Sequence, residues 1–184
     1  MLAGHLYLHL RENTGVRSGN HLFRVWHGRT SRVTPAPSQV PDNSGMRHLT
    51  PTEAWAWLQA ETERRTALGQ EPPLFVDVRM EIESLYVGRP PGVENIPWYE
   101  YPDLTPDAAR FAGAVAREAG TMDRPVLLIC RSGKRTLDAA AALEAAGFSN
   151  VAHVVHGFEG DLNDQFKRST LNGWRFDGLP WEQM

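Results

Sequence analysis

After residue 45, short unbroken apolar runs alternate with longer stretches in which apolar residues recur every three or four positions. The unbroken runs predict strands at 74–78, 93–96, 126–129 and 151–155. The spaced stretches predict helices at 50–67, 80–86, 106–119 and 135–146. Strands that alternate with helices indicate an open parallel sheet covered by helices on both faces. The expected fold class is therefore α/β; four strands are placed here, and we expect about five in the sheet.

Capping and turn residues predict where these helices begin and end. Thr50-Pro51-Thr52-Glu53 is a capping box with proline at the first helical position. Gly120 and Gly147 follow two later helices, where glycine commonly ends a helix. In the first helix we expect four apolar residues to be buried, namely Ala54, Trp55, Leu58 and Leu68.

Residues 1–45 differ in composition from the rest of the chain. They hold five arginines but only two acidic residues, and residues 34–45 read as a linker without apolar periodicity. An arginine-rich, acid-poor leader is also typical of organelle-targeting peptides, whereas the first ten residues make a poor secretory signal. We favour a poorly structured extension at 1–45, followed by one folded domain at 46–184.

Composition narrows the classes of function. A chain of 184 residues with 41% hydrophobic and 22% charged residues is typical of a globular protein that buries its own core. A net charge of −3 gives no basic field for nucleic acid. No apolar run approaches the roughly 20 residues that a membrane span needs. A single cysteine forms no internal disulfide, which indicates a reducing, cytoplasmic compartment.

That cysteine, Cys130, stands where a predicted buried strand meets a short cationic loop and the next helix. Cationic neighbours and a helix N-terminus favour the thiolate, which is the nucleophilic form. Gly133 lets the loop turn its backbone N–H groups toward an anion, and ligands of parallel sheets bind beyond the carboxyl ends of strands. The predicted catalytic residue is Cys130. The predicted substrate-binding residues are the six that follow it, Arg131, Ser132, Gly133, Lys134, Arg135 and Thr136.

Each of these residues also has a purely structural interpretation. Cysteine is often a small buried hydrophobe, loop lysines and arginines are often only solvated, and Arg135 is also an ordinary first-turn helix residue. The histidine pairs His5/His9 and His153/His156 lack the cysteine or carboxylate spacing that would complete a metal site. We therefore expect neither a metal nor a cofactor.

The loop resembles the active-site loop of rhodanese-type sulfurtransferases, which form a cysteine persulfide. Asp77-Val78-Arg79 resembles the Asp-x-Arg that ends an early rhodanese strand. Residues 88–97 (Gly-Arg-Pro-Pro-Gly-Val-Glu-Asn-Ile-Pro) resemble the family's Gly-His-x-Pro-Gly-Ala-x-Asn-Ile-Pro segment. Residues 157–160 (Gly-Phe-Glu-Gly) are similar to its Gly-Gly-x-x-x-Trp region. The resemblance covers about residues 46–184 and implies a single-domain, rhodanese-like fold.

Three positions depart from the family pattern. Arg89 stands where the family usually has histidine, Lys134 where many members have asparagine, and Thr136 where serine is common. None of these changes removes the nucleophile. Together they leave the preference for sulfur donor and acceptor open.

The resemblance implies a two-step transfer of sulfane sulfur. Cys130 takes sulfur from thiosulfate or a similar donor, and the persulfide passes it to cyanide, a thiol or an acceptor protein. Arg131 and Arg135 would contact the anion and Lys134 would add positive charge. Three further residues would support the loop, namely Asp77, Arg79 and Arg89.

Two other functions stay open. A cysteine phosphatase or arsenate reductase places five residues between its cysteine and arginine, whereas Cys130 and Arg135 are separated by four. A non-catalytic rhodanese-like module that binds a protein partner often lacks the cysteine, which this chain retains.

Overall fold

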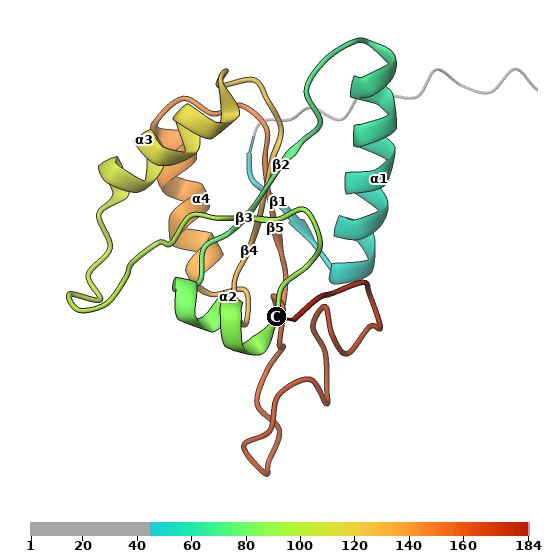
Figure 1. Ribbon diagram of the computed structural model, residues 1–184, viewed down its shortest axis with the longest axis vertical. Helices are drawn as coiled ribbons and strands as arrows, with labels where there is room; N and C mark the ends of the chain where they lie inside the picture. The colour runs from blue at the N-terminus through green and yellow to red at the C-terminus, as the bar shows by residue number, and fades with distance from the viewer. Residues whose placement is uncertain (1–44, 184) are drawn as a thin grey trace, which may run out of the picture. The chain divides into compact units, whose positions relative to one another are not determined.

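The structure is a computed structural model that describes residues 45–183, which form a five-stranded parallel sheet with helices on both faces (Figure 1). The elements in chain order are β1 (Arg47–Leu49), α1 (Pro51–Ala67), β2 (Leu74–Asp77), α2 (Glu81–Val87), β3 (Glu94–Asn95), α3 (Ala108–Ala119), β4 (Val126–Ile129), α4 (Arg135–Ala145) and β5 (Val151–Val154). The strand order is β1-β5-β4-β2-β3, and all neighbouring strands are parallel. The predicted α/β class is confirmed; the predicted extension at 1–45 lies almost entirely outside the described residues.

The three central strands are buried along their whole length. Their residues are almost all apolar, as expected for strands with helices on both faces. The register pairs Asp77 at the end of β2 with Ile129 at the end of β4. Residues that follow these two strands, Cys130 among them, therefore emerge at the same edge of the sheet.

Each face of the sheet has its own core. α3 and α4 cover one face and pack against Val76 and Leu128, whereas α1 covers the other face and packs against Phe75 and Leu127 (Figure 1). Trp174, from the segment after β5, is fully buried in the second core. The C-terminal segment thus supplies part of the core, although it contains no helix or strand of the sheet.

Helix α1 begins as its capping residues predict. The Glu53 amide donates to the Thr50 hydroxyl, and the Thr50 amide donates to the Glu53 carboxylate at 2.9 Å. The expected burial of Leu68 is wrong: this residue caps the C-terminal end of the helix, and 61% of it is exposed. It follows the last helical residue, so it lies outside the apolar stripe that faces the sheet.

Strand β1 was not predicted as a strand. It is three residues long, and its central residue, His48, is exposed. Such a short edge strand shows no apolar run, and its pairing with β5 defines it.

No helix within residues 45–183 has both the length and the apolar character needed to cross a membrane.

Candidate active site

Cys130 lies at the junction of β4 and the loop that leads into α4. The residue is only 1% exposed, and its Sγ accepts a hydrogen bond from the Gly133 amide at 3.2 Å. Gly133 has a φ of 82°, and a Cβ at this position would lie 2.8 Å from the backbone nitrogen of His156. Glycine is therefore required here, both for the backbone conformation and for the close approach to the end of β5.

The segment after β5 holds the other side of the loop. The amide of Phe158 donates to the Cys130 carbonyl at 2.7 Å, and the amide of Glu159 donates to the Arg131 carbonyl at 2.9 Å. In a trans peptide the N–H points opposite to the C=O. The N–H groups of Arg131 and Ser132 therefore face away from this segment.

These loop amides are available to a ligand. Within residues 45–183, the amides of Arg131, Ser132, Lys134 and Arg135 donate no hydrogen bond to another protein group. Free amides in a tight loop at a helix N-terminus form an anion-binding concavity. The loop can therefore hold negative charge next to the sulfur.

Glu83 on α2 binds one of the predicted cationic side chains, Arg135, and lies near a second, Arg131. Arg135 donates two hydrogen bonds to its carboxylate, at 2.7 and 2.8 Å, and the Arg131 Nε lies 4.0 Å from it. Burial opposes the ionisation of Glu83, but the hydrogen bonds and charge of Arg135 outweigh burial and lower the pKa of Glu83. Arg135 thus joins α4 to α2, and its predicted contact with a substrate anion stays a prediction.

Glu83 was missed by the sequence reasoning. It is separated from Arg135 by 52 positions, and it stands at the third position of a short helix, where glutamate commonly serves as a cap. The one available signal is its place shortly after the Asp77-Val78-Arg79 motif. Only the packing of α2 against the loop reveals its role.

We expect Glu83→Gln to destabilise the domain by about 2 kcal/mol at pH 7, because it leaves the largely buried Arg135 guanidinium without its counter-charge. Urea unfolding of the wild type and of Glu83→Gln measures the difference in the free energy of unfolding. Glu81→Gln, at an exposed position on the same helix, is the matched control and should change stability by less than about 0.5 kcal/mol. Equal stabilities of the two variants would show that the Glu83–Arg135 pair contributes nothing.

Arg131 and Lys134 lie nearer to solvent than the rest of the loop. Lys134 is exposed and makes no ion pair with another residue in the described part of the chain, and Ser132 is half-buried. About half of the Arg131 side chain is exposed. The loop therefore presents positive charge to solvent through Arg131 and Lys134.

Thr136 has internal partners only, although we predicted a substrate contact. Its side chain is fully buried, and its hydroxyl donates to the Gly133 carbonyl at 2.9 Å and lies 2.9 Å from Nδ1 of His153. The hydroxyl therefore faces the interior of the domain, beneath the loop.

Asp77 and Arg79 form a buried ion pair at the end of β2. The Arg79 Nη2 lies 2.6 Å from Asp77 Oδ2 and also donates to the carbonyl of Gly88 at 2.7 Å. The guanidinium carbon lies 4.6 Å from the ring centroid of Phe158, whose amide binds the Cys130 carbonyl. The pair therefore braces the segment that holds the loop.

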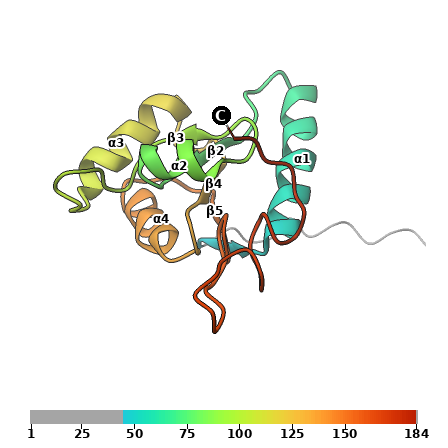
Figure 2. The ribbon, with the colours of Figure 1, turned by 60° about the horizontal axis from the view of Figure 1, so that its bottom comes forward.

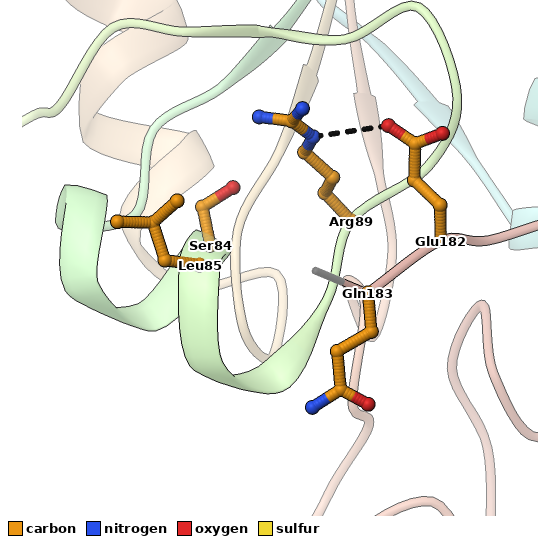
Figure 3. A pocket seen from close by; sticks show the side chains of 5 residues that line it. All are labelled: Ser84, Leu85, Arg89, Glu182 and Gln183. Carbon is orange, nitrogen blue, oxygen red and sulfur yellow. Dashed lines mark hydrogen bonds and ion pairs between the residues drawn. The ribbon is translucent and has the colours of Figure 1, made fainter.

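Arg89 is paired with the C-terminal segment. Its Nε is 3.2 Å from Glu182 Oε1, and the backbones of the two residues form an antiparallel bridge. Arg89 and Glu182 line a pocket of about 210 Å³, together with Ser84, Leu85 and Gln183 (Figure 3). The C-terminal segment runs toward β3 (Figure 2). It pairs there with Arg89, the residue that we predicted to support the loop.

The described histidines have partners other than metals. His153 contacts Thr136 and His48, and His156 lies 3.1 Å from Asp161. Across residues 45–183 no three His, Cys, Asp or Glu side chains come together in a way that could hold a metal ion. His5 and His9 lie outside the described residues.

The buried His153 should make the domain sensitive to acid. Burial, with a smaller contribution from His48, lowers the pKa of His153 from 6.5 to about 4. The unfolded chain therefore binds more protons than the folded domain between these pH values, so that stability falls as the pH falls through this window. We expect a loss of roughly 2 kcal/mol between pH 7 and pH 5 that is absent from His153→Asn. Equal losses in both proteins, measured by urea unfolding, would contradict this assignment.

Comparison with known proteins decides the family. The model of the rhodanese-like domain matches residues 52–164. The chain belongs to the rhodanese-like family. The crystal structure of Rv0390 from M. tuberculosis is similar to this rhodanese-like domain, with 33% sequence identity and a TM-score of 0.61, over 76% of this chain and 98% of that chain. The family predicted from the loop and its accompanying motifs is confirmed.

Other relatives cover the domain less fully. The rhodanese domain-containing protein CG4456 of Drosophila melanogaster is 34% identical over 78 residues, which are 42% of this chain and 70% of that protein. The uncharacterized protein RP600 of Rickettsia prowazekii is 33% identical over 61 residues, which are 33% of this chain and 44% of that protein. The chain thus matches less than half the length of this Rickettsia relative.

A thiosulfate sulfurtransferase from Pseudomonas aeruginosa shares the fold. It is 21% identical, with a TM-score of 0.50, over 75% of this chain and 20% of that chain.

Proposed function

We propose that this rhodanese-like domain is a sulfurtransferase that carries sulfane sulfur on Cys130. The observation that carries the proposal is the position of the Cys130 Sγ at the end of β4, 3.2 Å from the Gly133 amide and within a loop of unpaired amides. The donor is thiosulfate or a similar small molecule, and the acceptor is cyanide, a thiol or an acceptor protein. Because the chain has one cysteine, the sulfur must pass to a second molecule.

The chemistry has two balanced steps. The thiolate of Cys130 attacks the outer sulfur of thiosulfate, the sulfur–sulfur bond of the donor breaks, and sulfite leaves with the electron pair. The carbon of cyanide then attacks the outer sulfur of the persulfide, which releases thiocyanate and restores the thiolate. The loop amides stabilise the negative charge on the persulfide between these steps.

The charged residues of the loop divide into two roles. Arg131 and Lys134 are exposed to solvent and attract the anionic donor to the loop. Arg135 is bound to Glu83 and sets the position of the first turn of α4. Asp77 and Arg79 act on the loop through Phe158, whereas Arg89 is paired with Glu182.

Two features favour sulfur transfer over phosphoester hydrolysis. Four residues separate Cys130 from Arg135, which is one fewer than the loop of a cysteine phosphatase needs. Cys130 is also almost completely buried, so the reacting atom of the donor must enter the mouth of the loop. A single terminal sulfur atom meets this requirement better than a tetrahedral phosphate group.

Intact-mass measurement tests the proposal. After incubation of the full chain with thiosulfate, we expect the mass of one additional sulfur atom, which cyanide removes and prior alkylation prevents. Because Cys130 is the one cysteine, the site of modification needs no further mapping. An unchanged mass after incubation with thiosulfate and with polysulfide would instead support a non-catalytic module. We also propose a cytoplasmic location, because a protein with a single cysteine forms no internal disulfide and suits a reducing compartment.

A further inference from the structure

A buried chain of hydrogen bonds leads from the loop to an exposed edge of the sheet. The Thr136 hydroxyl lies 2.9 Å from the Gly133 carbonyl and 2.9 Å from Nδ1 of His153. Nε2 of His153 lies 2.7 Å from Nδ1 of His48. Thr136 is fully buried and His153 is 3% exposed, whereas His48 on β1 is exposed. The chain therefore joins four residues from the loop, α4, β5 and β1.

The donors in this chain have a defined direction. The Gly133 carbonyl can only accept, so the one hydroxyl hydrogen of Thr136 points to it. Nδ1 of His153 must then donate to the Thr136 oxygen, and its Nε2 must accept from Nδ1 of His48. Each ring needs only one proton for this, which agrees with the lowered pKa of His153, since that residue is neutral at pH 7.

This chain of hydrogen bonds determines how one peptide of the loop is oriented. The Gly133 carbonyl and the Lys134 amide belong to the same trans peptide and point in opposite directions. Because Thr136 holds the carbonyl toward the interior, the Lys134 amide faces away from the interior. The Gly133 amide lies 3.2 Å from the Cys130 Sγ, so the peptide that Thr136 and His153 keep in place directly follows the amide that contacts the sulfur.

We propose that His153 is a positioning residue for sulfur transfer: through Thr136 it orients the Gly133–Lys134 peptide, and His48 in turn orients His153. The inference rests on the proposed sulfurtransferase function. It gives His153 a role that does not require contact with the substrate. It also explains why a polar ring is retained in a strand whose other residues are apolar.

His153→Leu tests this role. Leucine fills the space but leaves the Thr136 oxygen without its donor, and we expect kcat for thiosulfate-dependent sulfuration of cyanide to fall about tenfold with little change in KM. His153→Asn should retain kcat within about threefold, because the asparagine amide can donate from a position close to that of Nδ1. The matched control is His156→Asn. Residue 156 has a φ of 65°, which suits asparagine, and it takes no part in this chain of hydrogen bonds. It should leave kcat within about twofold of the wild type.

Amide resonances provide a readout that does not depend on turnover. In ¹H–¹⁵N spectra, the Gly133 and Lys134 peaks should move in His153→Leu and lie near their wild-type positions in His153→Asn and His156→Asn. If His153→Leu does not fold, the exposed His48→Ala should move the same two peaks and lower kcat about threefold.

The two proposals can fail separately. A wild-type protein that takes no sulfur from thiosulfate or polysulfide overturns the proposed function, and the two amide peaks then still test the positioning. The positioning role is overturned if both peaks and kcat are unchanged in His153→Leu, or if His153→Asn is as impaired as His153→Leu.

Discussion

Cys130→Ser should lower the rate of thiosulfate-dependent sulfuration of cyanide by at least about a thousandfold. Serine fits the same space, but its hydroxyl is not ionised at neutral pH and its oxygen forms no persulfide. The loss should therefore appear in kcat, and thiosulfate should add no mass to the variant. Steady-state assays with thiosulfate and cyanide, together with intact-mass spectra, measure both effects.

The fold of Cys130→Ser should be unaffected, because residue 130 is held in place through its backbone. The Cys130 carbonyl accepts from the Phe158 amide at 2.7 Å whichever side chain is present. Urea unfolding should show a change of less than about 1.5 kcal/mol, as expected for a swap of similar volume. A variant that is stable and keeps the wild-type rate would reject Cys130 as the sulfur carrier and leave the protein-binding module as the better interpretation.

Gly157→Ala should destabilise the domain by about 4 kcal/mol and disrupt the loop around Cys130. Gly157 has a φ of 61°, and a Cβ on it would overlap the Cys130 carbonyl oxygen and lie 2.8 Å from the backbone nitrogen of Ser132. These neighbours are backbone atoms, so a side-chain rotation cannot relieve the overlap. Urea unfolding measures the loss of stability, and the mass assay with thiosulfate measures the loss of sulfur uptake.

Gly69→Ala separates the backbone strain from the overlap of the added Cβ with its neighbours. Gly69 has a similar φ of 66°, but no atom lies within 4 Å of the Cβ position. The control therefore carries the backbone strain alone, about 1 kcal/mol, and should take up sulfur at the wild-type rate. If the two variants were equally stable, the close packing of Gly157 against the Cys130 loop would contribute nothing to the domain.

Glu83 and the segment 157–159 together change the interpretation of the loop. Its cationic sequence suggests three side chains that converge on an anion, but one of them, Arg135, is committed to Glu83. The sulfur instead accepts from the Gly133 amide, and the loop carbonyls of Cys130, Arg131 and Gly133 are bound by Phe158, Glu159 and Thr136, respectively. In the proposed reaction, sulfur transfer therefore depends on backbone geometry at least as much as on side-chain charge.

Local patterns in the sequence were sufficient to predict the central strands, the start of α1 and the place of Cys130 after β4. An unbroken apolar run forms a buried strand wherever it lies in the chain, and a capping box is complete within four residues. The same holds for Gly133, whose use in a tight loop depends on its own missing side chain.

Only the tertiary structure decided which residues meet at this loop. Glu83 meets Arg135 across 52 positions, and His153 meets Thr136 across 17. A glutamate on a short helix and a histidine in an apolar strand have ordinary explanations when considered one at a time. Their roles follow from the order of strands in the sheet and from how closely the segments at its edge pack, and neither property is encoded in any short stretch of the chain.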